Sequence, residues 1–167
     1  MATNGKQTDR SIAILLQLLD QAYNRKAWHG PNLKGSLRRV TAEQAVWRVI
    51  PGRHSIAEIA VHCAYWKYAA RRRLLGEKRG SFPLKGSNWF TVPDPLDEKS
   101  WRNYLILLET SHRKLREAIV ELSPLQLNIV PLGSRVTNLA LIEGIAAHDI
   151  YHAGQVQLIK RLYQNSA

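Results

Sequence analysis

Two histidines stand four residues apart on a stretch whose neighbours at helical spacing are leucine, isoleucine and valine. They are His148 and His152. In a helix, residues i and i+4 lie on one face, so two imidazoles placed in this way can hold one metal ion together. Histidines on an apolar seam cost burial energy unless something binds them. Their position therefore indicates a metal site.

A third histidine, His62, lies on the apolar stripe of another expected helix, with Ile59, Trp66 and Ala69. Taken alone, any one of the three histidines is more simply interpreted as a core or surface residue. Three neutral imidazoles on the seams of two helices predict a site for one divalent transition metal ion. The remaining positions of that ion would be open to water or substrate.

These histidines must be positioned by long helices. Hydrophobic periodicity predicts four long helices in the chain. We expect helices over residues 9–27, 55–75, 97–122 and 137–163. Ser55 and Glu58 form a capping-box pattern at the start of the second helix, and Gly76 follows its end. No segment shows convincing strand alternation. The predicted fold class is therefore all-α, a four-helix bundle.

The links between these helices are long, about 27, 20 and 14 residues, so crossovers are possible and a simple up-down order is not assumed. Residues 41–47 and 123–127 are expected to form short helical segments within them. The link over residues 77–95 carries Asn88, Trp89, Phe90 and three prolines. A long ordered loop with exposed aromatic residues often covers a functional site.

The length and composition predict one domain over residues 1–167, with an ordinary hydrophobic fraction of 45%. No stretch approaches the roughly 18 apolar residues of a membrane span, so no membrane partner is expected. The first ten residues contain no apolar signal core. Cys63 is the single cysteine, which excludes an internal disulfide. Together these features predict a cytoplasmic protein.

The charge balance is basic, with 24 Lys and Arg against 13 Asp and Glu and a net charge of +11. This balance favours acidic partners and permits a second hypothesis, a nucleic-acid-binding bundle in which any metal is structural. However, the basic residues are scattered. The densest run, Arg71 to Arg73, ends a helix, where cations meet the negative end of the dipole. Without a helix-turn-helix signature, a nucleic-acid partner is not favoured.

Four further residues could line the pocket around the three histidines: His112, His29, Gln155 and Trp66. His112 lies on the third helical seam and could be a fourth ligand or a proton shuttle, although a hydrogen-bonded core histidine is the simpler interpretation. His29 could line the pocket mouth from a loop, where an exposed histidine is more usual. Gln155 follows His152 by almost one turn and could touch it.

The other neighbours of the histidines have simpler interpretations. Glu58 could orient His62, but its capping-box role already explains it. Cys63 points about 100° away from His62 on a helix, which favours a small apolar core role. Asp149 and Tyr151 are expected to lie off the ligand face. His54 is expected at the surface.

The sequence resembles a known family, the DinB/YfiT-like metalloproteins. The segment from Gly52 to Trp66 is similar to their second helix, and residues 148–155 are similar to their terminal metal-binding helix. The most specific part is the His148–His152 spacing followed by Ala, Gly and Gln. Residues 28–31 are also similar, so the resemblance covers nearly the whole chain in order. It implies a four-helix bundle, a three-histidine site formed by His62, His148 and His152 for zinc, nickel or a similar ion, and homodimers.

The resemblance also implies classes of activity. Some members are S-transferases that use low-molecular-weight thiols such as bacillithiol, mycothiol or glutathione, and others resemble metal-dependent isomerases or have no assigned reaction. A divalent ion held by three neutral histidines lowers the pKa of a bound water or thiol. No certain carboxylate base stands beside the ligands, which favours thiol transfer to a small-molecule substrate over hydrolysis. The leading hypothesis is a thiol S-transferase, with a hydrolase on the same site as the alternative.

Overall fold

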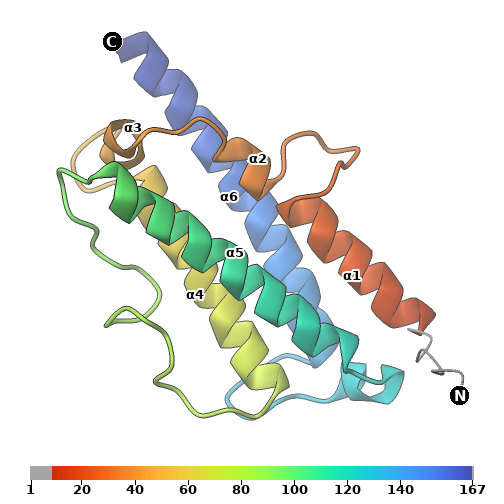
Figure 1. Cartoon of the computed structure of the whole chain (residues 1–167). Coiled ribbons are helices and arrows are strands. Elements are labelled where there is room, and N and C mark those ends of the chain that lie inside the picture. The colour runs from red at the N-terminus through yellow and green to blue at the C-terminus, as the bar shows by residue number, and fades with distance from the viewer. Residues whose placement is uncertain (1–8, 167) are drawn as a thin grey trace, which may run out of the picture.

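The computed structural model describes residues 9–166, in which four long helices form the body of the molecule (Figure 1). Residues 1–8 and 167 of the expected domain lie outside this range. The long helices are α1 (Arg10–Tyr23), α4 (Ile56–Leu74), α5 (Glu98–Val120) and α6 (Asn138–Ser166). The links contain α2 (Leu33–Ser36), α3 (Ala42–Val46) and a 3-10 helix, η1 (Pro124–Asn128). Over residues 9–166 there is no strand beyond an isolated bridge between Ser87 and Trp89, so the predicted all-α class is confirmed.

The four long helices pack in a ring that differs from a simple up-down bundle. Helix α1 packs against α6, α6 against α4, α4 against α5, and α5 against α1. Helices that follow each other in the chain, α1 and α4, therefore lie across a diagonal, and so do α5 and α6. The links over residues 24–55 and 121–137 must cross the bundle, which explains their length. The loop over residues 75–97 joins two neighbours, α4 and α5, so its length is not needed for a crossing (Figure 1).

Side-chain caps fix where the long helices begin. Asp9, Ser55 and Asp97 each accept a hydrogen bond from a backbone N–H of the first turn. Ser55 and Glu58 form the expected capping box. The Arg48 guanidinium donates two hydrogen bonds to the Glu58 carboxylate, at 2.7 and 2.8 Å. These contacts account for Glu58 without a role in orienting His62.

The helix ends differ from expectation in two places. Helix α1 ends at Tyr23 rather than at residue 27, because Asn24 leaves the helical conformation and the Asn32 side chain holds the Arg25 carbonyl at 2.8 Å. Helix α6 continues to Ser166, three residues beyond its expected end. The expected short segments appear as α3 and η1. Helix α2 was not anticipated, since four residues are too few to show a hydrophobic period.

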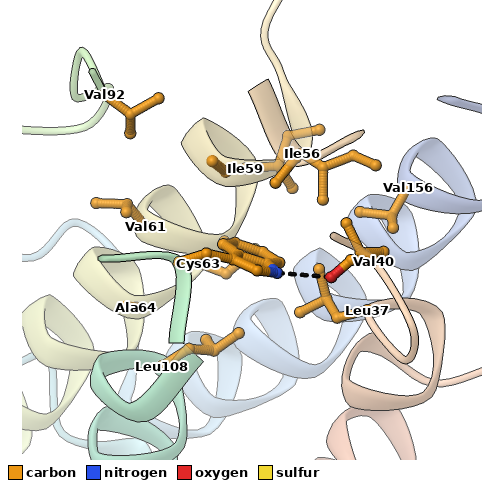
Figure 2. Packing of buried hydrophobic residues seen from close by; sticks show 14 of the residues in the cluster. Leu37, Val40, Ile56, Ile59, Val61, Cys63, Ala64, Val92, Leu108 and Val156 are labelled. Carbon is orange, nitrogen blue, oxygen red and sulfur yellow. Dashed lines mark hydrogen bonds between the residues drawn. The ribbon is translucent and has the colours of Figure 1, made fainter. Parts of the chain in front are cut away.

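A buried tryptophan joins α5 to the link before α3. The Trp101 indole N–H donates to the Val40 carbonyl at 2.8 Å inside the larger hydrophobic cluster (Figure 2). Leu37, Leu108 and Val156 surround this contact from the first link, α5 and α6. Because the first link crosses the bundle, this hydrogen bond satisfies a carbonyl that would otherwise be buried without a partner.

We expect Trp101→Phe to lower the free energy of unfolding by about 2–3 kcal/mol, because it removes buried volume and leaves the Val40 carbonyl unpaired. Urea unfolding of the metal-free protein measures this change. The matched control is Trp28→Phe at a fully exposed site, where the unfolding midpoint should not change. Equal midpoints for the two variants would contradict this packing.

Candidate metal centre

The three predicted histidines meet between α4 and α6. The Nε2 atom of His148 lies 3.0 Å from Nε2 of His62 and 3.1 Å from Nε2 of His152. His62 and His152 are buried, and His148 is half-buried. One nitrogen from each ring lies within 4.8 Å of the other two, so the group could hold a metal ion. The structure thus brings together three side chains separated by up to 90 positions in the chain.

Hydrogen bonds on the outer side of two rings set their tautomers. Nδ1 of His62 donates to the Asn88 carbonyl at 2.8 Å, and Nδ1 of His152 donates to Oε1 of Gln155 at 2.7 Å. Because both partners are oxygen acceptors, both Nδ1 atoms carry the hydrogen. The Nε2 atoms of His62 and His152 therefore present lone pairs to the centre of the group. Gln155 thus touches a candidate ligand, as the sequence suggested.

The chemistry of this donor set fits a divalent ion. His148 approaches both other Nε2 atoms, and a single proton on its Nε2 could bridge only one of the two contacts. The other contact would be left with no hydrogen between its two nitrogens. A divalent ion held by His62, His148 and His152 would accept a lone pair from each Nε2 and so satisfy both contacts at once.

Burial keeps the three imidazoles neutral. Burial and the neighbouring histidines lower the pKa of His148 to about 3, and burial lowers the pKa of His152 to about 4. The pKa of His62 is also lowered, mainly by burial. Neutral imidazole is the form that binds metals, so no proton has to leave these rings at neutral pH.

The loop between α4 and α5 covers the site. Trp89 is stacked between His54 and His62, with ring centroids 3.5 and 3.8 Å away, and Asn88 adopts a positive φ of 64°. The sequence predicted a covering loop, but it did not predict that Phe90 is buried and Trp89 half-buried. His54 is exposed, as expected, and its ring forms the outer layer of this stack.

A cavity of about 450 Å³ borders His152. It is lined mostly by apolar side chains from the link before α4 and from α6. Tyr151 also lines this cavity, and it is not among the three possible ligands. Its ring centroid is 5.0 Å from that of His152, and its hydroxyl accepts a hydrogen bond from Nε2 of Gln155 at 3.0 Å. A tyrosine next to a ligand in sequence can reach the ring of that ligand because its side chain is long.

The other three possible pocket residues differ in their positions. His112 is a buried core residue stacked on Tyr23 with ring centroids 3.9 Å apart, and it does not join the three histidines. Neither of its nitrogens has a hydrogen-bond partner among the described residues, contrary to the simpler expectation. His29 is exposed in a loop. Trp66 donates to Oδ1 of Asn88 at 3.0 Å and so supports the covering loop.

Sequence reasoning missed a buried ion pair behind the site. The Lys67 ammonium on α4 bonds the Asp149 carboxylate on α6, and both side chains are fully buried. Cys63, His148 and Asp149 form a second group of possible ligand atoms within 4.8 Å. However, Lys67 already supplies the positive charge that a second cation would bring. Burial raises the pKa of the Cys63 thiol, which agrees with its expected apolar role.

The model of the DinB superfamily matches residues 7–156, a range that contains all three histidines. The chain belongs to the DinB superfamily. No curated protein and no solved structure matches this DinB-superfamily chain. Among residues 9–166, no helix has the length and apolar character to cross a bilayer.

The buried His112 predicts a pH dependence of stability. Burial and nearby cations lower its pKa from 6.5 to about 3, so the folded protein takes up this proton less readily than the unfolded chain. Its contribution to stability is present above pH 6.5 and is lost as the pH falls towards 3, by at most about 1.4 kcal/mol per pH unit. We therefore expect the stability difference between wild type and His112→Gln to shrink between pH 7 and pH 5.

Urea unfolding at several pH values checks this expectation, with His29→Gln in an exposed loop as the control that leaves the slope unchanged. The Asp20 carboxylate lies 3.4 Å from Nε2 of His112. If an ion pair with Asp20 outweighed burial, the difference between wild type and His112→Gln would instead widen as the pH falls.

Proposed function

We propose that this DinB-superfamily chain is a metal-dependent enzyme in which His62, His148 and His152 hold one divalent ion, zinc or nickel. The observation that carries the proposal is the approach of three Nε2 atoms at 3.0 and 3.1 Å. The lowered pKa values of the three rings support it, because they keep the lone pairs free at neutral pH.

The reaction we propose is thiol S-transfer to a small electrophile. A divalent ion held by three neutral imidazoles keeps its full charge, lowers the pKa of a bound thiol or water and polarises an oxygen. In the transfer, the thiol would lose its proton to water and its sulfur would bond to an electrophilic carbon. The bond between that carbon and the leaving group would break, and the leaving group would depart with the electron pair. The chain's own residues orient the rings through Asn88 and Gln155, exclude water with Trp89 and accept an apolar substrate in the cavity beside His152.

Hydrolysis on the same site is less well supported. Attack by water is helped by a general base, commonly a carboxylate or histidine. Within the described part of the chain, no Asp or Glu lines the cavity beside His152, and the ring of His54, which does line it, is stacked on Trp89. Asp149 is close in sequence, but its carboxylate is buried against Lys67. A thiol, with a lower intrinsic pKa than water, needs less help to lose its proton.

We also propose a homodimer, as the resemblance implies, and no nucleic-acid partner, because the basic residues are scattered and the sequence has no helix-turn-helix signature. Gly144, Ala147 and Gly154 lie exposed on α6 and leave a slim surface that a second helix could approach closely. Sedimentation of the purified chain tests the assembly. Binding of DNA or RNA that weakens steeply with salt would contradict the second statement.

Metal content tests the ligand assignment. We expect about one divalent ion per chain in untagged wild-type protein and no stoichiometric ion in His148→Ala, because the central nitrogen of the group is removed. Elemental analysis after dialysis measures this. His29→Ala removes an exposed loop histidine and should keep the ion. Equal metal content in all three proteins would show that the ion binds elsewhere.

Gln155→Ala should weaken metal binding by about 10–100-fold, because it removes the acceptor that fixes the tautomer and orientation of His152. Competition with a chelator of known affinity measures the change. Gln155→Glu keeps an acceptor and should retain tight binding, and Gln164→Ala, exposed on the same helix, serves as the control. If all three variants bind metal like wild type, the hydrogen bond has no such role.

The reaction itself is tested with metal-loaded protein, candidate thiols and an electrophilic acceptor. Bacillithiol, mycothiol or glutathione should be consumed with a thioether product, and His148→Ala should abolish the reaction. No consumption of any of them, together with metal-dependent cleavage of esters or amides, would instead assign a hydrolase.

A further inference from the structure

A second cavity, of about 510 Å³, lies between the C-terminal half of α4 and the following loop, on the other side of Asn88 from the histidines. Four cationic side chains line it: Arg72 and Arg73 from α4, and Arg79 and Lys85 from the loop. Over the described residues, no Asp or Glu lines this cavity. Its walls also contain four aromatic side chains, those of Tyr65, Trp66, Tyr68 and Phe82.

The position of cations at the end of α4 agrees with the helix dipole, but the dipole does not explain this cluster. Arg79 and Lys85 come from outside the helix and converge on the same cavity. Arg71, the first arginine of the run, is paired with the Glu77 carboxylate, and Arg72 donates to the Glu77 carbonyl at 2.9 Å. Glu77 itself does not line the cavity.

Arg73 is the least satisfied member of the cluster. Its guanidinium carbon lies 5.9 Å from the centre of the Trp66 ring, and its Nε atom is buried with no hydrogen-bond partner in the described residues. Burial and the charges of Arg72 and Arg79 lower its pKa. Arg73 lines the cavity, so an anion there would accept hydrogen bonds from its guanidinium.

We propose that this cavity binds a small organic anion, with a carboxylate or phosphate held by Arg73 and Arg79 and a flat apolar body against Trp66 and Phe82. Arginine is suited to this task because its planar donors match both anion types and its face stacks on aromatic rings. The volume accommodates a small molecule rather than a bare ion alone. The proposal does not depend on a bound metal, since none of the three histidines lines this cavity.

Two hydrogen bonds link the cavity to the metal centre. The wall residue Trp66 donates to the Asn88 side chain at 3.0 Å, and the Asn88 carbonyl accepts from His62 at 2.8 Å. A ligand seated in the cavity is thus separated from a candidate metal ligand by one loop residue. The cavity is placed to hold the anionic part of a molecule, or a second anionic molecule, beside the site of the reaction.

Phenyl phosphate is the probe for this proposal, titrated by calorimetry at low salt into the whole chain freed of metal by a chelator. We expect saturable binding at one site, stronger than that of inorganic phosphate, because the ring adds aromatic contact. Benzyl alcohol, which has the ring without the charge, should bind at least about tenfold more weakly. Because the protein is metal-free, binding cannot arise from a phosphate on the metal.

The variants Arg73→Gln and Arg79→Gln should each weaken phenyl phosphate binding by about tenfold or more. Arg113→Gln is the charge-matched control, because Arg113 is exposed on α5 and paired with Glu117. Arg79 lies in the loop, so its variant keeps the test valid if Arg73→Gln does not fold. An equal loss in Arg113→Gln, unchanged binding in both cavity variants, or no saturable binding to wild type would overturn the proposal.

Discussion

The site depends on one electrostatic constraint, that nitrogens facing one another at 3.0 and 3.1 Å cannot all present lone pairs unless something positive lies among them. The neighbours of the three rings disfavour two other arrangements, rotation of the rings and their protonation. Asn88 and Gln155 hold the outer hydrogens of two rings, so those rings cannot rotate their lone pairs away. Burial disfavours protonation of the rings themselves. A divalent cation among the three nitrogens would satisfy all of their lone pairs together.

The order of the helices makes this arrangement possible. Because α4 and α6 are neighbours in the ring, a single histidine on one meets a pair on the other. The same order frees the loop between α4 and α5 from any need to cross the bundle. That loop instead supplies Asn88 and Trp89 to the candidate metal centre. It also forms most of the wall of the second cavity, the one lined by cationic side chains. Figure 1 shows it running outside α4 before it returns to the start of α5.

Local patterns predicted what depends on local geometry. The pair His148 and His152 follows from the helical repeat, and Ser55 with Glu58 follows from capping chemistry. Periodicity alone does not say whether two helices are adjacent or diagonal, so the meeting of His62 with the pair rested on family resemblance as well. The end of α1 at Tyr23 depends on a contact from a later segment, since the Asn32 side chain donates to the Arg25 carbonyl.

The parts that escaped prediction are contacts between distant segments. The place of Trp89 between His54 and His62 depends on a loop conformation that no repeat encodes. The bond between Lys67 and Asp149 joins positions 82 residues apart. From the sequence alone, each of these two residues would be expected at the surface, because charged side chains are mostly exposed. The convergence of Arg79 and Lys85 with the end of α4 has the same origin, because it needs the loop to fold back over the helix.

The buried bond between Lys67 and Asp149 has a consequence for how the bundle holds its alignment. If α6 slid along α4 by one turn, both charges would lose their partner while still shielded from water, which is far more costly than a shift between apolar faces. Asp149 follows His148 directly, and Lys67 stands five positions after His62, so this bond fixes the register of the same two segments that carry the imidazoles. The bond between Lys67 and Asp149 therefore aligns the three rings independently of any ion.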